Sequence, residues 1–329
     1  MTAPAAIDAT GLVKKFGPLR AVDGIDLEVS RGEIFGVLGP NGAGKTTALR
    51  MLATLLPIDA GQARVFGVDV ASEPHRIRQL IGMTGQFASV DEDLTATENL
   101  WMFGRLQGLR SADARAAAKR LLGQFGLEEA ANKPIAQFSG GMRRRLDLAA
   151  SLITRPPLIF LDEPTTGLDP RTRGQMWDTI RGLVNEGCTV LLTTQYLDEA
   201  DQLAGRIAVI DRGRKVAEGT PGELKASVGN STLQLQLAPD ADQELARQIV
   251  RRVAGADPVL TPESGRMNVP LDTADGAADV LIGFREAGVG IASVSVAQPT
   301  LDEVFFAITG HGADPVDEKQ TDESVLEVK

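Results

Sequence analysis

The sequence predicts an α/β core that contains a helical insert and is followed by a small α+β domain. Three observations lead to this fold class. Apolar runs of strand length alternate with helical stretches over the first two hundred or so residues, which is typical of an α/β domain. A glycine-rich loop joins one of these strands to a helix. A second series of short strands and helices follows a turn-rich break at residues 219–222.

The strands and helices of the predicted core follow from their apolar patterns. A short strand is expected at Ile34–Leu38, followed by a helix over residues 46–55 that a proline ends. Residues 158–161 and 189–192 are continuous apolar runs, which indicates strands that are covered on both faces. Residues 173–184 between them have helical spacing.

A largely helical insert is expected from about residue 94 to residue 153, because residues 114–122 are rich in strong helix formers. Two aromatic residues of this insert, Trp101 and Phe103, leave two interpretations open. They belong to the core of the insert, or they dock a cytoplasmic helix of a membrane partner.

The segment after the break predicts the element order β-α-β-β-α-β. The elements are expected at residues 232–237, 243–253, on both sides of Gly265, and at 277–287 and 291–296. This order suggests a small ferredoxin-like domain, which a helix over 301–308 closes. We therefore expect three parts: a nucleotide-binding domain at 1–225, an accessory domain at 226–310 with a linker near 227–230, and an acidic, disordered tail at 311–329.

Composition excludes several classes of protein. A net charge of −10 argues against a nucleic-acid binder, which normally carries a basic surface. No run approaches the roughly 18 apolar residues that a membrane span needs, and the first residues lack a signal peptide. The single cysteine, Cys188, excludes an internal disulfide and lies in a run that predicts a buried strand, so a packed thiol is expected. These features predict a soluble cytoplasmic protein.

One loop matches the pattern G-x-x-x-x-G-K-[ST]. It consists of Gly39, Pro40, Asn41, Gly42, Ala43, Gly44, Lys45 and Thr46. Successive backbone N–H groups and a following helix start create positive potential in such a loop, and the glycines let the backbone approach a phosphate. Lys45 is expected to neutralise the β- and γ-phosphates of ATP, and the Thr46 hydroxyl to ligate Mg²⁺.

Two carboxylates, Asp162 and Glu163, end an otherwise apolar strand. Because burying unpaired charge is costly, the pair needs a partner. Magnesium is the expected partner of Asp162, through a water molecule. Glu163 is then placed to orient or deprotonate the water that attacks the nucleotide.

A second anion-binding helix start is predicted at Ser139, Gly140 and Gly141. Ser139 is a favourable N-cap for a helix over 143–152, and the two glycines permit close backbone approach. The basic run Arg143–Arg145 that follows is expected to be a solvated helix face, with contact to anionic lipid or a partner as the alternative.

These segments resemble the ATP-binding-cassette (ABC) ATPases over roughly residues 7–225. The resemblance implies a homodimer in which each Ser139-Gly140-Gly141 turn faces the phosphate loop of the other copy. It further implies that the phosphate loop extends to Thr47 and that Phe16 stacks on adenine. Gln86 is then the residue that senses magnesium and leads to the transporter contact. Asp169 is expected in the loop that crosses the dimer interface. Glu163 is then the catalytic glutamate.

Two positions depart from the pattern of that family. Met142 stands where the family usually has glutamine, which is a mild change. Gln195 stands where most members have a histidine that contacts the γ-phosphate. Glutamine still donates a hydrogen bond but carries no charge, and neither His75 nor His311 has a context that replaces the histidine. Slower or differently gated hydrolysis is expected.

The longer strings 139–149 and 194–201, with the ending 299–306, resemble daunorubicin/doxorubicin-resistance ATP-binding subunits of actinobacteria. The resemblance implies an ATPase at the cytoplasmic face of the membrane that powers efflux of hydrophobic drugs or lipids through a separate permease, with ATP and Mg²⁺ as cofactors. The alternatives are a regulatory or sensor ATPase with weak hydrolysis, an exporter of a different substrate class, and, least favoured, an ATPase acting on nucleic acid or the ribosome.

Overall fold

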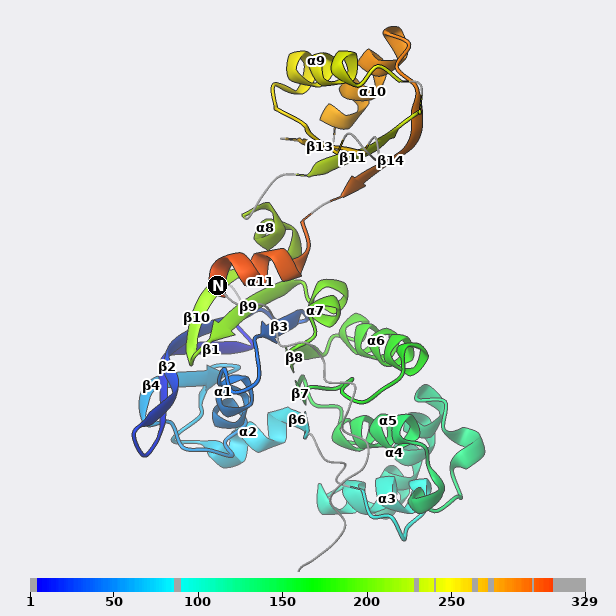
Figure 1. Ribbon diagram of the computed structural model, residues 1–329. Coiled ribbons are helices and arrows are strands. Elements are labelled where there is room, and N and C mark those ends of the chain that lie inside the picture. The colour runs from blue at the N-terminus through cyan, green and yellow to red at the C-terminus, as the bar shows by residue number, and fades with distance from the viewer. Residues whose placement is uncertain are drawn as a thin grey trace, which may run out of the picture. The chain divides into compact units, whose positions relative to one another are not determined.

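The computed structural model describes residues 5–85, 90–227, 231–239, 241–261, 266–271, 275–297 and 299–309 (Figure 1). These residues fall into two compact units that divide between Pro221 and Gly222. Gln86, part of the expected linker and the acidic tail lie outside the described residues. Among the helices that are described, none combines the length and apolar character required to span a bilayer.

The first unit is built around a six-stranded sheet with the order β10-β9-β3-β8-β7-β6. Its three central strands, β3 (Ile34–Leu38), β8 (Thr189–Thr194) and β7 (Leu158–Asp162), are parallel and buried along their whole length. The outer strands are β9 (Arg206–Asp211), β10 (Arg214–Gly219) and β6 (Ile81–Thr84). Because parallel strands end at one edge of a sheet, the carboxyl ends of β3, β7 and β8 lie together.

A second, antiparallel sheet of the same unit has the order β2-β1-β4-β5. It consists of β1 (Ile7–Phe16), β2 (Leu19–Val29), β4 (Ala60–Val65) and β5 (Val68–Asp69). Side chains of this sheet share one apolar core with α1 (Lys45–Leu52) and with Phe35 and Phe160 of the central sheet. Helix α2 (Pro74–Leu80) contributes Ile77 to the same core.

Helix α1 is shorter than its apolar pattern indicates. The helix expected to reach residue 55 ends at Leu52, because Thr54 adopts a left-handed conformation with φ of 62° that no α-helix continues.

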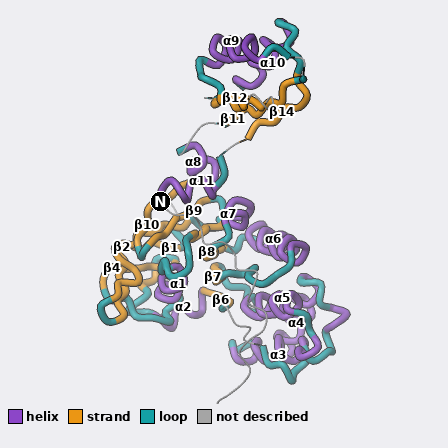
Figure 2. The backbone as a smooth tube through the Cα atoms, viewed as in Figure 1, coloured by secondary structure: helices purple, strands orange, loops and turns teal. Residues whose placement is uncertain are grey.

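The helical insert contains α3 (Ala96–Leu106), α4 (Ser111–Gln124) and α5 (Gly140–Ser151), which share a core with α6 (Pro170–Asn185) (Figures 1 and 2). Phe103 packs against this core, and the Trp101 indole N–H donates to the Ser111 hydroxyl at 3.3 Å. These contacts favour the packing interpretation of the two aromatic residues.

Cys188 lies immediately before β8 and is half-buried. Burial raises the pKa of its thiol to about 11, and the negative charge of Glu186 adds to this shift. The packed thiol is thus confirmed, although the strand begins one residue later.

The second unit has the ferredoxin-like arrangement that its element order predicts. Its antiparallel sheet has the order β12-β13-β11-β14. The strands are β11 (Thr232–Leu237), β12 (Val259–Thr261), β13 (Arg266–Pro270) and β14 (Ile291–Ala297), and the helices of the motif are α9 (Gln243–Ala254) and α10 (Gly276–Glu286). Leu233 and Leu235 of the sheet pack with Ile249 and Phe284 of the two helices. Helix α8 (Pro221–Ala226) spans the division, and α11 (Leu301–Thr309) follows the sheet.

Candidate active site

The phosphate loop connects β3 to α1 and depends on glycine at three positions. Gly44, with φ of +104°, is the N-cap of α1, and a Cβ there would lie 2.2 Å from the Ala21 carbonyl oxygen. A Cβ at Gly39 would lie 2.1 Å from the Ile210 carbonyl oxygen, and Gly42 has φ of +77°. Carbonyl groups of β9 and β2 therefore lie close to this loop, and only glycine fits at positions 39 and 44.

A cavity of about 330 Å³ opens over the loop. Residues 41–47 line it together with Phe16 at the end of β1 and Glu163 at the end of β7. Phe16 is 46% exposed, and Lys14 Nζ lies 5.8 Å from its ring centroid. The structure thus brings the predicted adenine-stacking residue and the predicted phosphate ligands to one cavity.

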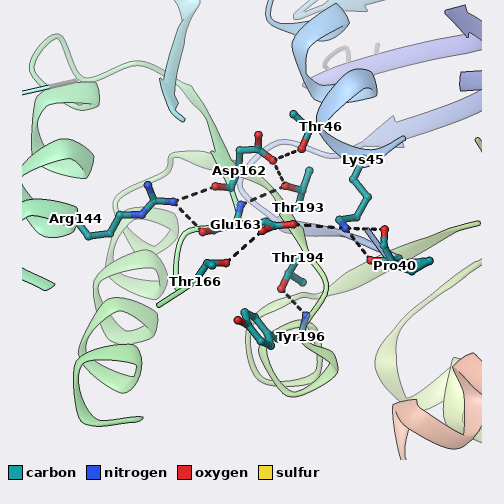
Figure 3. A network of polar contacts seen from close by, with 11 residues as sticks. Pro40, Lys45, Thr46, Arg144, Asp162, Glu163, Thr166, Thr193, Thr194 and Tyr196 are labelled. Atoms are coloured by element: carbon teal, nitrogen blue, oxygen red, sulfur yellow. Dashed lines mark hydrogen bonds and ion pairs between the residues drawn. The ribbon is translucent and has the colours of Figure 1, made fainter. Parts of the chain in front are cut away.

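Lys45 points into this site from the first turn of α1 (Figure 3). Its ammonium donates to the carbonyl oxygens of Gly39 at 2.7 Å and Pro40 at 3.1 Å, and lies 3.7 Å from Glu163 Oε1. Burial lowers the pKa of Lys45, while the charges of Glu163 and Asp162 oppose that shift. A buried cation held in this way is suited to receive an anionic phosphate.

Asp162 is fully buried and is held by two hydroxyl groups (Figure 3). Its Oδ1 accepts from Thr46 Oγ1 at 2.8 Å and from Thr193 Oγ1 at 2.6 Å. Its Oδ2 is buried and has no hydrogen-bond partner among the described residues. A carboxylate oxygen in need of a partner beside a threonine hydroxyl is a donor set that fits Mg²⁺. Sequence reasoning did not find Thr193, because its role depends on the neighbouring strand.

Glu163 stands in a left-handed backbone conformation with φ of 49°, which costs a non-glycine residue about 1–2 kcal/mol. Its N–H donates to the Thr193 carbonyl oxygen at 3.0 Å, and Thr166 Oγ1 donates to its Oε2 at 3.3 Å. The residue is only 8% exposed, and its side chain lies beside Lys45 (Figure 3). The strained turn directs the carboxylate to the phosphate loop.

Arg144 corrects the expectation that the basic run forms a solvated face. Its guanidinium, which is half-buried, donates to the backbone around the strand end: Nη2 to the carbonyl oxygens of Asp162 and Glu163, Nε to that of Pro164 and Nη1 to that of Gly85. The flanking arginines are also engaged within the chain, Arg143 with Glu92 and Arg145 with the Phe125 carbonyl oxygen. Three adjacent arginines give no local signal of which one turns inward.

The Ser-Gly-Gly turn begins α5 as predicted, although the helix starts at Gly140 instead of residue 143. Ser139 is its N-cap and accepts from the Met142 N–H at 3.3 Å. A Cβ at Gly141 would lie 2.6 Å from Thr172 Cγ2, so the glycine lets α5 approach α6. Thr172 in turn donates from its N–H and hydroxyl to Asp169, which caps α6 and whose pKa these hydrogen bonds lower. The turn and the Asp169 loop are therefore adjacent within one chain.

Gln195 directly follows β8 and is half-buried. The segment after it, which includes α7 (Leu197–Leu203), is fixed to α6: the Arg173 guanidinium lies 5.0 Å from the Tyr196 ring centroid and 3.2 Å from Asp198 Oδ2. Glu199 of α7 is fully buried and accepts from Thr165 Oγ1 at 2.8 Å. Burial raises the pKa of Glu199, and its hydrogen bonds partly oppose that shift. His75 lies in α2.

A nucleotide-hydrolysing cassette is the class of protein that this fold and this site define. The chain matches the ABC transporter family over residues 22–166. It is 52% identical over 324 residues, 98% of this chain and 97% of the relative, to the daunorubicin/doxorubicin resistance ATP-binding protein DrrA of Streptomyces peucetius. The chain therefore belongs to the family of ABC transporter ATP-binding proteins and is an ATPase of that family.

Other relatives and solved structures agree with this family. The doxorubicin resistance ATP-binding protein DrrA of Mycobacterium tuberculosis (strain ATCC 25618 / H37Rv) is 42% identical, with 92% of this chain and 93% of the relative covered. The Nod factor export ATP-binding protein I of Ralstonia nicotianae is 46% identical, with coverage of 66% and 68%. A dimeric ATP-binding cassette in a post-hydrolysis state with ADP and Pi has a TM-score of 0.60 and 26% identity, covering 65% of this chain and 98% of that one.

Proposed function

We propose that this chain hydrolyses ATP as a homodimer and thereby powers efflux of hydrophobic drugs, antibiotics or lipids through a separate membrane permease. The observation that carries the proposal is the convergence of Lys45 and Glu163 on one cavity at the phosphate loop, beside Thr46, whose hydroxyl donates to Asp162. The near full-length likeness to drug-resistance ATP-binding proteins supports the substrate class. Binding to a permease would place the chain at the cytoplasmic face of the membrane.

In this proposal the loop residues bind the phosphates of ATP. The backbone N–H groups of residues 41–47 and the start of α1 favour negative charge, and Lys45 neutralises the β- and γ-phosphates. Thr46 and Asp162, with Gln86, are the residues that would hold Mg²⁺. When bound there, Mg²⁺ would supply positive charge that neutralises the phosphates. Phe16 would stack on adenine at the open end of the cavity.

Glu163 orients the attacking water and accepts its proton. For this it must release Lys45, which the phosphates of ATP would attract. Gln195, at the end of the neighbouring strand β8, donates an amide hydrogen bond to the γ-phosphate in place of an imidazole. Without a positive charge at that position, the transition state gains less stabilisation, so slow turnover is expected.

The dimer would be completed by the turn at Ser139, Gly140 and Gly141, which each copy presents to the phosphate loop of the other. Asp169 lies beside this turn through Thr172 and would cross the same interface. The dimeric neighbour with ADP and Pi supports this mode of assembly.

Replacing Glu163 with Gln tests the proposal. The variant is expected to lose turnover and to accumulate as an ATP-bound dimer, measured by phosphate release and by size-exclusion chromatography with ATP. Glu129→Gln, at an exposed carboxylate of the helical insert, is the matched control and is expected to behave as the parent protein. A Glu163→Gln variant that hydrolyses ATP at the parent rate would refute the assignment.

Transport is tested separately in inverted membrane vesicles that contain the chain and its permease. ATP-dependent accumulation of doxorubicin, followed by its fluorescence, is expected for the parent and not for Glu163→Gln. An unchanged signal in the parent with and without ATP contradicts the drug substrate. The likeness to Nod factor export proteins supports an exporter of another substrate class as the alternative.

A second candidate function is a regulatory ATPase with weak hydrolysis, which Gln195 favours. Gln195→His separates the two. A large gain in turnover with no change in efflux would support regulation, whereas turnover and efflux that change together support a transport motor.

A further inference from the structure

The backbone on both sides of Glu163 is bound by one nitrogen atom of Arg144. Nη2 of Arg144 lies 3.0 Å from the carbonyl oxygen of Asp162 and 2.8 Å from that of Glu163 (Figure 3). In an extended strand, successive carbonyl groups point to opposite sides and do not share a donor. They converge here because Glu163 has a positive φ of 49°.

The same guanidinium holds the two segments that flank this turn. Its Nε donates to the Pro164 carbonyl oxygen at 3.0 Å, and its Nη1 donates to the Gly85 carbonyl oxygen at 2.6 Å. The first contact continues the turn beyond Glu163, and the second ties it to the residue after β6. Hydrogen bonds from a charged donor are roughly twice as strong as neutral ones. Four of them offset the cost of the left-handed conformation.

We propose that Arg144 is the positioning residue of hydrolysis: it holds Glu163 in the left-handed conformation that directs its carboxylate to the phosphate loop. This inference rests on the role proposed for Glu163. Because Arg144 belongs to the helix that Ser139 caps, it also links the Ser-Gly-Gly turn of one copy to the water-activating residue of the same copy. Arg144 itself does not touch the reacting atoms.

The variants Arg144→Gln and Arg144→Lys test the inference in the full-length chain, with single-turnover hydrolysis of radiolabelled ATP as the readout. A displacement of about 1 Å in a reacting group costs about a hundredfold in rate, so we expect Arg144→Gln to slow hydrolysis by roughly 10- to 100-fold. ATP affinity is expected not to fall, and to rise by at most about fivefold, because a displaced Glu163 opposes the phosphates less. Arg144→Lys, which keeps the charge with fewer donors, is expected to be intermediate.

Arg145→Lys is the matched control, because it changes the next arginine of the same helix, which binds the Phe125 carbonyl oxygen away from the site. It is expected to leave the single-turnover rate unchanged. Thermal unfolding of all variants separates loss of folding from loss of positioning. An Arg144→Gln variant that melts at the parent temperature and hydrolyses ATP slowly supports the inference.

The combination of Arg144→Gln with Glu163→Gln decides whether Arg144 acts through Glu163. If it does, adding Arg144→Gln to Glu163→Gln slows the residual hydrolysis by less than about twofold. If the two substitutions reduce the hydrolysis rate additively, the inference is overturned. It is also overturned if Arg144→Gln hydrolyses ATP at the parent rate while Glu163→Gln is slow. If Glu163→Gln keeps the parent rate, the proposed function fails as well, and the inference falls with it.

Discussion

The Lys45 ammonium lies 3.7 Å from Glu163 Oε1, and both side chains are nearly excluded from solvent. The residue assigned to the phosphates and the residue assigned to the attacking water therefore form an ion pair with each other. In the proposed function, ATP therefore has to compete with Glu163 for Lys45, and Glu163 would also repel the anionic phosphates.

Removing the charge of Glu163 is therefore expected to tighten nucleotide binding. For Glu163→Gln we expect about fivefold higher affinity for a non-hydrolysable ATP analogue, which corresponds to about 1 kcal/mol. Isothermal titration calorimetry measures this, with Glu129→Gln as the control. An affinity equal to that of the parent would show that the ion pair does not oppose binding.

Gly44→Ala is expected to destabilise the first unit and to abolish nucleotide binding. The new methyl group would lie 2.2 Å from the Ala21 carbonyl oxygen in addition to the cost of φ at +104°, so we expect a loss of about 3 kcal/mol or more. Gly108→Ala is the control: it has a φ of +87° but open space around it, and about 1 kcal/mol is expected. Urea unfolding compares the two. Equal losses would mean that the contact with Ala21 relaxes.

The buried carboxyl group of Glu199 predicts a pH-dependent stability. Burial raises its pKa in the folded protein above the ordinary glutamate value of 4.5. The folded state then binds more protons than the unfolded state between these two pKa values. The contribution of Glu199 is thus fully present below about pH 4.5 and is lost as the pH rises through the raised pKa.

Glu199→Gln is expected to remove this dependence, because the amide oxygen still accepts from Thr165 and Trp177 and carries no charge. The parent minus variant difference in unfolding free energy is expected to fall between about pH 4.5 and about pH 7. Urea unfolding at both values measures it, and Glu129→Gln controls for general charge effects. A difference that grows with pH would contradict the raised pKa.

Cys188 is expected to resist alkylation in the folded protein. Its pKa of about 11, against an ordinary cysteine value of 9.0, reduces the reactive thiolate by about a hundredfold at neutral pH. Mass spectrometry after timed exposure to iodoacetamide, in buffer and in urea, tests this. Equal rates in the two conditions would contradict the packed thiol.

Much of the fold was predictable because it depends on neighbouring residues. The strand Ile34–Leu38 followed by a glycine-rich loop, the Ser139 cap and the β-α-β-β-α-β order of the second unit all follow from local patterns, and the structure contains them. Helix ends were less predictable, as the early end of α1 at Leu52 shows, since one left-handed residue decides them.

The sequence by itself determined the chemistry of this protein: a phosphate loop, two carboxylates at a strand end and a capped Ser-Gly-Gly turn are local strings of residues. Only the tertiary structure decided how they act together. Thr46 and Asp162 meet across 116 positions of the chain, and Arg144 turns inward to bind the backbone of Glu163. The reason is physical. Hydrogen bonds between distant segments form only when the sheet aligns the ends of its strands, and no local sequence pattern specifies that alignment.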